Sequence, residues 1–417
     1  MIELLAALLA AFSLGSEFGV GADYSTQEYL VGSYDTTNYE WMEEDTLDIE
    51  TEGRGFLTLR ANFDTDNIRA GATNTASFTT RSVRDYLYAW YEHELAPGLE
   101  LKLSDDIEVR DYHGLLPELN DTLYEGDDYL SNTARAGLRY EPWDWLSLDV
   151  GDALELLRYR EPDSFSYDYA VNRLDVEGTV EFGFFTTLDA EYTWAVRRAA
   201  QQPERNYGEH GFRLGLDRYF DSGLSLTAEN DLVRRQYPGQ AYSFLEEGVR
   251  LTGRYDMDGV AVEVEEEARW TWYDSTTEVY PNLFENSVQA AVELQPLDDL
   301  TLRLGPRYDH AAGLQQRGDD DYREFSVFAA VDFFRLDRFW LSVEDRVGRR
   351  NYPYADTTWQ SNYVFNELSV FGSWTIVPVG ASGLVLEAMA SITPEWHADK
   401  SDDFDLAVYS LELRYGF

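Results

Sequence analysis

The feature that most constrains this chain is a two-residue alternation of apolar and polar side chains from about residue 54 to the carboxyl terminus. Leu174 and Val176, for example, alternate with Asp175 and Glu177. Successive side chains of a strand point to opposite faces, so this pattern predicts strands with one apolar and one polar face. The same pattern recurs in residues 188–197, 262–272 and 325–333, where Glu266 and Phe328 are exceptions.

Short turn signals alternate with longer polar connections along the chain. The short turns lie at residues 96–98, 141–144, 182–184, 221–223, 256–259, 296–299, 335–338 and 378–383. The longer connections include residues 66–80, 113–130, 199–206, 274–282, 313–321 and 352–362. Eight short turns and nine loops predict about 18 antiparallel strands, and the segment 23–53 leaves 16 or 20 open.

The length of the predicted segments decides between all-β architectures. Each segment has about 12 residues, more than the 5–6 of soluble strands and enough for a tilted membrane strand. A propeller would pack four short strands into each 40-residue repeat, and a soluble sandwich would turn more often. We therefore expect an all-β, transmembrane, antiparallel up-and-down β-barrel that forms a single domain over residues 54–417.

Aromatic residues, which make up 15% of the chain, gather at the ends of the predicted strands. Amphipathic rings prefer the two membrane interfaces, so the clusters predict two aromatic belts. One belt follows the short turns, at Trp143, Trp145, Phe182, Phe184, Phe185, Tyr219, Phe220, Phe333, Phe334, Phe339 and Trp340. The other lies near the loops, at Tyr159, Trp270, Trp272, Tyr273 and Tyr308.

The amino terminus predicts export. Residues 2–14 form an apolar stretch that is too short to span a bilayer as a helix but suits a secretory signal. We assign residues 1–22 to a signal peptide, with cleavage after Ala22 or within residues 13–16. Glu3 departs from the pattern because a positive charge belongs there, and a buried helix is the alternative. The role of residues 23–53 stays open.

The carboxyl terminus has an alternating apolar pattern that ends in phenylalanine. Its apolar face holds Tyr409, Leu411, Leu413, Tyr415 and the last residue, Phe417. This ending resembles the assembly signal of Gram-negative outer-membrane β-barrel proteins, which implies the bacterial outer membrane, its lipids and lipopolysaccharide, and the barrel assembly machinery. The architecture is porin-like in size, and porin-like barrels are often trimers, so a homo-oligomer is open. The plug motif of the fatty-acid channels is absent, and TonB-dependent receptors have a globular plug and more strands.

The polar face of the predicted strands should line the lumen, where charges orient polar solutes or pair across strands. Wall side chains alone cannot fill a barrel this wide, so water, a plug or a loop must occupy it. The candidate lumen-facing residues are Arg135, Arg139, Asp175, Glu177, Glu263, Glu265, Glu267, Arg269, Arg303, Arg307, Glu344 and Arg346.

The net charge of −45 excludes phosphate-mediated nucleic-acid binding. Two explanations of this acidity stay open, a saline habitat and a lumen that attracts cations. The acidic loop at residues 318–321 suggests divalent cations as partners, although it lacks the ligand spacing of a known calcium loop, and solvated acids are the simpler interpretation.

No chemistry-bearing motif stands out. The chain has no cysteine, and its five histidines form neither HExxH nor a close pair, so no metal site, cofactor or catalytic centre is predicted. Asp85, His93 and His113 are the residues that a catalytic centre at the rim would use.

Three functions follow from these patterns. The first is a porin-like channel for passive diffusion of small polar solutes, with a preference for cations. The second is a non-conducting structural or surface-interaction barrel with acidic loops, and the third is a rim enzyme. We expect the first and do not expect an enzyme.

Overall fold

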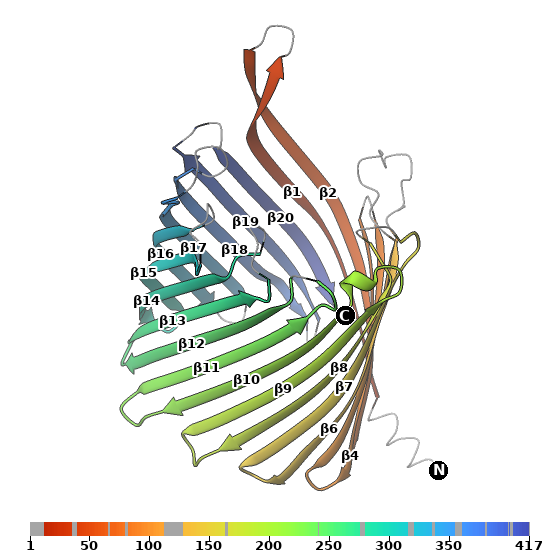
Figure 1. Ribbon diagram of the computed structural model, residues 1–417. Coiled ribbons are helices and arrows are strands. Elements are labelled where there is room, and N and C mark those ends of the chain that lie inside the picture. The colour runs from red at the N-terminus through yellow and green to blue at the C-terminus, as the bar shows by residue number, and fades with distance from the viewer. Residues whose placement is uncertain are drawn as a thin grey trace.

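The structure, a computed structural model, is a closed antiparallel sheet of 20 strands (Figure 1). It describes residues 12–35, 40–65, 67–79, 82–111, 128–162, 166–240, 242–275, 280–315, 321–335, 338–354, 361–379, 382–398, 400 and 403–416. The strands are β1 (Phe12–Asp35), β2 (Glu40–Asp64), β3 (Ile68–Thr79), β4 (Val83–Ala96), β5 (Leu99–Asp111), β6 (Tyr129–Trp143), β7 (Leu146–Tyr159), β8 (Tyr169–Glu181), β9 (Thr186–Ala199), β10 (Tyr207–Tyr219), β11 (Leu224–Gln236), β12 (Phe244–Met257), β13 (Val260–Tyr273), β14 (Leu283–Leu297), β15 (Leu300–Gly313), β16 (Tyr322–Arg335), β17 (Phe339–Asn351), β18 (Tyr363–Val379), β19 (Ser382–His397) and β20 (Phe404–Gly416).

The connectivity is up-and-down. Each strand pairs with the next strand in the chain, and β1 pairs with β20 to close the barrel. One short 3-10 helix, η2 (Pro203–Arg205), lies between β9 and β10. Within the described part of the chain, no helix has the length and apolar character needed to cross a bilayer.

The predicted fold class is confirmed, and the strand count of 20 lies at the upper end of the expected range. The difference from 18 arises at the amino-terminal side. Residues 66–80, which we expected to be a loop, contain strand β3, whose small and polar residues lack the apolar pattern that marks the other strands. Residues 23–35 and 40–53 belong to β1 and β2.

The first hairpin is the longest, and Figure 1 shows it rising above the other strands. The predicted signal segment overlaps β1 at residues 12–22, where the backbone is extended, and residues 1–11 lie outside the described residues. The signal peptide stays a prediction.

The strands of the described chain are joined at one end of the barrel at the positions where the sequence predicts short turns, such as residues 96–98 and 221–223. Gly98 and Gly223 show why glycine stands there, since their φ angles are 73° and 85°. A Cβ at Gly98 would lie 2.4 Å from the carbonyl oxygen of Glu141, and one at Gly223 would lie 2.5 Å from that of Asp256. Because the turns pack this closely on the next hairpin, only a residue without a side chain fits.

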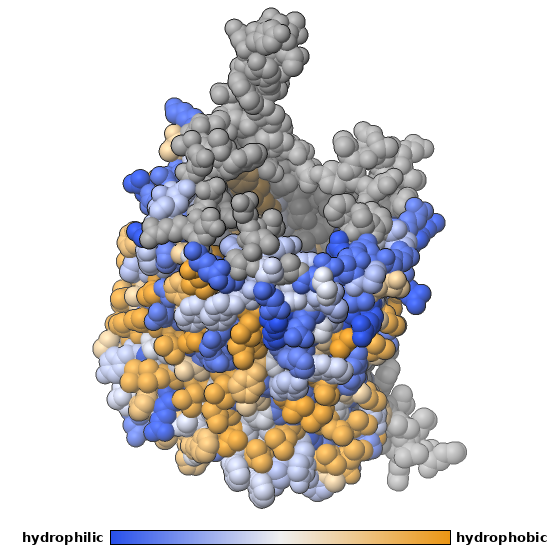
Figure 2. All heavy atoms as spheres, viewed as in Figure 1, coloured by the Kyte–Doolittle hydropathy of each residue, from blue (hydrophilic) through white to orange (hydrophobic). Residues whose placement is uncertain are grey.

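The wall has two chemically different faces. Directly opposed residues of antiparallel strands share a face, so the register assigns each side chain to one side. One face carries exposed apolar side chains such as Val176, Val262 and Val327, and the other carries most of the ion pairs. Figure 2 shows hydrophobic residues over most of the visible outer wall and hydrophilic residues toward its upper edge. The apolar face is therefore the outer one, as in a membrane barrel.

The aromatic belt beside the short turns is present in part on the outer rim, where Trp143 and Trp145 stack with ring centroids 5.1 Å apart, whereas Tyr219, Phe334 and Trp340 have the register of the inner face. The predicted loop-side belt is wrong in part. Trp270 and Trp272 face outward, whereas Tyr159 and Tyr273 face inward, opposite Tyr129 and Phe244. Alternation decides the face of each ring, and these two tyrosines have the parity of the polar residues.

The outer face also carries polar pairs that sequence patterns did not reveal. In each, an asparagine amide donates a hydrogen bond to a carboxylate on the neighbouring strand, which satisfies both groups on a face that meets lipid. The pairs are Asn74–Asp85 at 2.8 Å, Asn132–Asp105 at 2.7 Å, Asn172–Asp152 at 2.8 Å, Asn286–Glu266 at 3.3 Å and Asn366–Asp345 at 2.5 Å. Glu266, the acidic exception on an apolar face, is therefore paired.

Candidate functional site

The inner wall is the candidate site because it holds all the predicted lumen-facing residues. Register places them on the face opposite the exposed apolar side chains. Arg135 and Arg139 lie on β6, Asp175 and Glu177 on β8, and the set from Glu263 to Arg269 on β13. Arg303 and Arg307 lie on β15, and Glu344 and Arg346 on β17. Their role in function stays a prediction.

On the wall from β12 to β15, arginines neutralise the acids. Arg254 reaches Glu293 at 2.9 Å and Glu263 at 3.3 Å, and Arg303 reaches the other oxygen of Glu263 at 2.5 Å. Arg250 and Arg269 are 3.2 Å and 3.3 Å from Glu267. The result is two groups of ion pairs, one around Glu263 that spans four strands and one around Glu267, and each of these carboxylates has a cationic neighbour.

Further ion pairs lie on β15 to β18. Glu324 is only 1% exposed, and its carboxylate accepts from Arg350 at 2.7 Å and lies 3.4 Å from Arg346. Arg346 also contacts Glu367 at 2.9 Å, and Arg307 contacts Asp309 at 2.9 Å. Since a buried carboxylate is costly without partners, the two arginines make the burial of Glu324 possible.

The wall from β7 to β9 is different because its acids face one another. Glu177 lies directly opposite Glu191 on β9 and opposite Asp149 on β7. Asp149 is paired with Arg139 at 3.0 Å, but Asp175 and Glu177 have no ion pair among the described residues. Like charges directly opposed destabilise a sheet. The carboxylates of Asp175 and Glu177 therefore remain available to a cation in the lumen.

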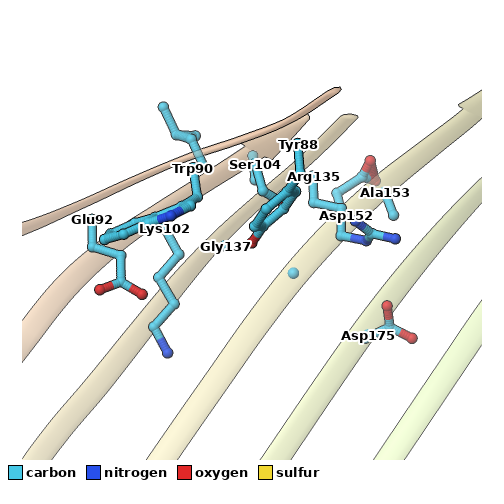
Figure 3. A pocket seen from close by; sticks show the side chains of 13 residues that line it. Tyr88, Trp90, Glu92, Lys102, Ser104, Arg135, Gly137, Asp152, Ala153 and Asp175 are labelled. Atoms are coloured by element: carbon cyan, nitrogen blue, oxygen red, sulfur yellow. The ribbon is translucent and has the colours of Figure 1, made fainter. Parts of the chain in front are cut away.

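A recess in the wall lies beside these acids. Gly137 and Gly151 are directly opposed on β6 and β7, and two residues without side chains leave the inner surface hollow. The recess has a volume of about 280 Å³. Figure 3 shows Glu92 and Lys102 on one flank and Arg135 and Asp175 on the other, with the rings of Tyr88 and Trp90 beside them. The recess thus offers both signs of charge and two aromatic rings to a polar solute.

A ring of aromatic side chains lines the inner wall at the loop end, and we call it the aromatic collar. Each member is the first residue of a strand that follows a loop, and each faces inward. The collar consists of Tyr129, Tyr169, Tyr207, Phe244, Tyr322, Tyr363 and Phe404.

Arginines hold the collar in place. The guanidinium of Arg350 lies 4.3 Å from the ring centre of Tyr322, and those of Arg197 and Arg235 each lie 4.6 Å from that of Tyr207. Such stacking is favourable when the cation is partly desolvated. Sequence analysis missed the collar, although its signal is visible as an aromatic residue at the first position of successive strands.

The acids of the wall do not form a metal centre. In the ranges that the structure describes, no three His, Asp or Glu side chains come together in a way that could hold a metal ion. The loop residues Gly318, Asp319 and Asp320 lie outside the described residues, as does His113. Asp85 is bonded to Asn74, and His93 lies beside Tyr91 at 3.2 Å.

The last strand shows the predicted pattern on the outer face. Tyr409, Leu411 and Leu413 are 40%, 54% and 39% exposed and alternate with inward residues such as Arg414. Phe417 lies outside the described residues. Recognition of this strand by the assembly machinery stays a prediction.

Comparison with known proteins identifies the fold. No protein-family model matches the chain, and no curated protein matches it in sequence. Among solved structures, it is similar to BauA, the ferric preacinetobactin receptor from Acinetobacter baumannii, with a TM-score of 0.58, 10% identity, and coverage of 97% of this chain and 80% of that one. It is also similar to the alcaligin outer-membrane receptor FauA from Bordetella pertussis, with a TM-score of 0.56, 12% identity, and coverage of 95% and 76%.

These likenesses show the fold alone, since the identities are low. They agree with the closed wall and its apolar outer face in identifying an outer-membrane β-barrel. Backbone groups in a bilayer must be satisfied internally, and a closed barrel does so without an exposed edge. The predicted location in the bacterial outer membrane is confirmed.

Proposed function

We propose that this barrel is a porin-like channel through which small polar solutes diffuse passively, with a preference for cations, and that it performs no catalysis. The observation that carries the preference is the group of acids on β7 to β9. Glu177 opposes Glu191, and Asp175 lies beside them without an ion pair among the described residues. Carboxylates without an ion pair, such as those of Asp175 and Glu177 among the described residues, raise the local concentration of cations.

The remaining features of the inner wall support passage of polar solutes. The ion pairs on β12 to β15 and β15 to β18 keep the inner wall hydrophilic. The recess at Gly137 and Gly151 widens the lumen locally. The aromatic collar places flat rings at the entrance, where a solute loses part of its hydration and gains contacts with the wall.

Single-channel conductance of the refolded barrel in a planar bilayer under a KCl gradient tests this proposal. We expect stable open steps and a reversal potential that favours K⁺. Glu177→Gln with Glu191→Gln should move that potential toward zero, because it removes two lumen charges and keeps the side-chain volumes.

The matched control is Asp152→Asn with Glu266→Gln, which removes two charges from the outer face. The control should leave the potential unchanged. Equal shifts in both variants would mean that net charge, and not the wall at β7 to β9, sets selectivity. A correctly folded barrel without conductance would overturn the channel and favour the non-conducting, surface-interaction role.

A further inference from the structure

The outer face carries arginines at its loop end, and two of them form a pair. Arg349 on β17 lies directly opposite Phe325 on β16, and Arg323 is two residues from Phe325 on the same face. Diagonal neighbours of this kind lie about 7–8 Å apart, within reach of one another's long side chains. Both arginines are exposed.

Among the residues that the structure describes, these two cations have no counter-charge. Most arginines of the inner wall contact a carboxylate, as Arg350 contacts Glu324 at 2.7 Å. Arg323 and Arg349, by contrast, form no ion pair or side-chain hydrogen bond within the described ranges, although the chain has 78 acidic residues against 33 basic ones. Two adjacent unpaired cations repel one another. An anion that lies between them removes this repulsion.

The height of the pair along the wall indicates which anion. Arg323 precedes Arg335, at the short-turn end of the same strand, by 12 residues. With a rise of about 3.3 Å per residue and a tilt of about 40°, this spacing spans about 30 Å, slightly more than the apolar band of about 25 Å. The pair therefore lies at the level of lipid headgroups on the loop side of the membrane.

The surface below the pair is apolar. Phe325, Val327 and Val347 are 57%, 43% and 49% exposed and lie on the same face, on the short-turn side of Arg323. Val364, which lies opposite Arg349 on β18, is 41% exposed. A ligand that occupies this surface has an anionic head at the arginines and acyl chains along the wall.

We propose that Arg323 and Arg349 form a binding site for a phosphate-bearing lipid of the outer leaflet. Guanidinium groups bind phosphate in a bidentate manner, and two of them enclose one phosphate from both sides. The acyl chains pack on Phe325, Val327 and Val347. The site is on the outer face and does not depend on whether the lumen conducts, so the lipid site and the channel can be tested separately.

Native mass spectrometry of the refolded full chain in detergent, titrated with diphosphoryl lipid A, tests the site. Arg323→Gln with Arg349→Gln should weaken binding about tenfold, because charge-assisted bonds to the phosphate are lost. The control is Arg335→Gln with Arg338→Gln, which removes two exposed arginines from the opposite end of the same hairpin. The control should bind lipid A as the unmodified protein does.

Equal weakening in both variants, or none in either, would overturn the site. Two further probes use the unmodified protein. Dephosphorylated lipid A should bind about tenfold more weakly than the diphosphoryl form. Inorganic phosphate should not displace lipid A at equal concentration, and displacement would show a phosphate site that makes no use of the acyl chains, contrary to the proposal.

Discussion

The inner wall on β12 to β15 and the inner wall on β7 to β9 are built from the same residue types, yet they treat charge differently. On the first, Arg254 and Arg303 share Glu263, and Arg254 also holds Glu293. On the second, Glu177 has an acid opposite it on both sides, Asp149 and Glu191, and the arginines of this row, Arg139 and Arg213, lie one strand further away. The named carboxylates of the first wall form ion pairs with arginines, whereas Asp175 and Glu177 on the second form none among the described residues.

This difference teaches that charge content does not separate structural from functional acids. Register decides the matter, because a one-residue shift would bring a different residue opposite each carboxylate. Acids with an arginine partner stabilise the wall, and acids that oppose other acids destabilise it. Since the second arrangement lowers stability, its presence beside the recess suggests a role in transport.

The largest effect is expected from reversing charge on the inner wall from β7 to β9. Glu177→Lys with Glu191→Lys should turn a cation-preferring channel toward anions, with a change in the permeability ratio of about tenfold, because the local potential changes sign. The measurement is the reversal potential under a KCl gradient. A ratio that stays the same would remove the distinction between the two walls.

The next effect concerns the outer face of β7 and β8, where Asp152 is paired with Asn172 at 2.8 Å. Asn172→Leu should lower the free energy of unfolding by about 1–3 kcal/mol, because it leaves a carboxylate unsatisfied on the lipid side. Urea titration in lipid vesicles measures this. The double variant Asp152→Leu with Asn172→Leu should recover most of the loss, and a further loss would contradict the assignment of these residues to the outer face.

A smaller effect is expected on the inner wall from β12 to β15. Arg254→Gln should lower the free energy of unfolding by about 1 kcal/mol, because the pairs are partly solvated. It should also shift the reversal potential further toward K⁺, since Glu293 and Asp256 lose their partner. A shift of the reversal potential away from K⁺ would contradict the idea that unpaired carboxylates on either wall attract cations into the lumen.

The smallest effect concerns Asp274, just beyond the end of β13, whose carboxylate accepts a hydrogen bond of 2.6 Å from Arg234. This bond lowers the pKa of Asp274 below its ordinary value. A carboxyl with a lowered folded-state pKa contributes stability above its unfolded pKa of about 3.9 and loses the contribution as pH falls through the lower folded value. Asp274→Asn should thus slightly reduce stability at neutral pH and leave it unchanged at the lowest pH. A difference that grows on acidification would contradict this.

The alternation of residues such as Leu174 and Asp175 by itself determined the fold class and the face of the candidate lumen-lining side chains. This is possible because alternation is a local property of an extended backbone. Local turn chemistry likewise located the short turns, including Gly98 and Gly223. Strand β3 was missed because its small and polar residues form a strand without a strong alternation.

Only the tertiary structure decided which charges meet. Arg303 pairs with Glu263, 40 residues away and two strands distant, while Glu177 faces Glu191 and not an arginine. The asparagine–carboxylate pairs, the aromatic collar and the proximity of Arg323 to Arg349 were likewise visible only in the tertiary structure. Each depends on the register between strands, which the closure of the whole barrel sets and no single segment encodes.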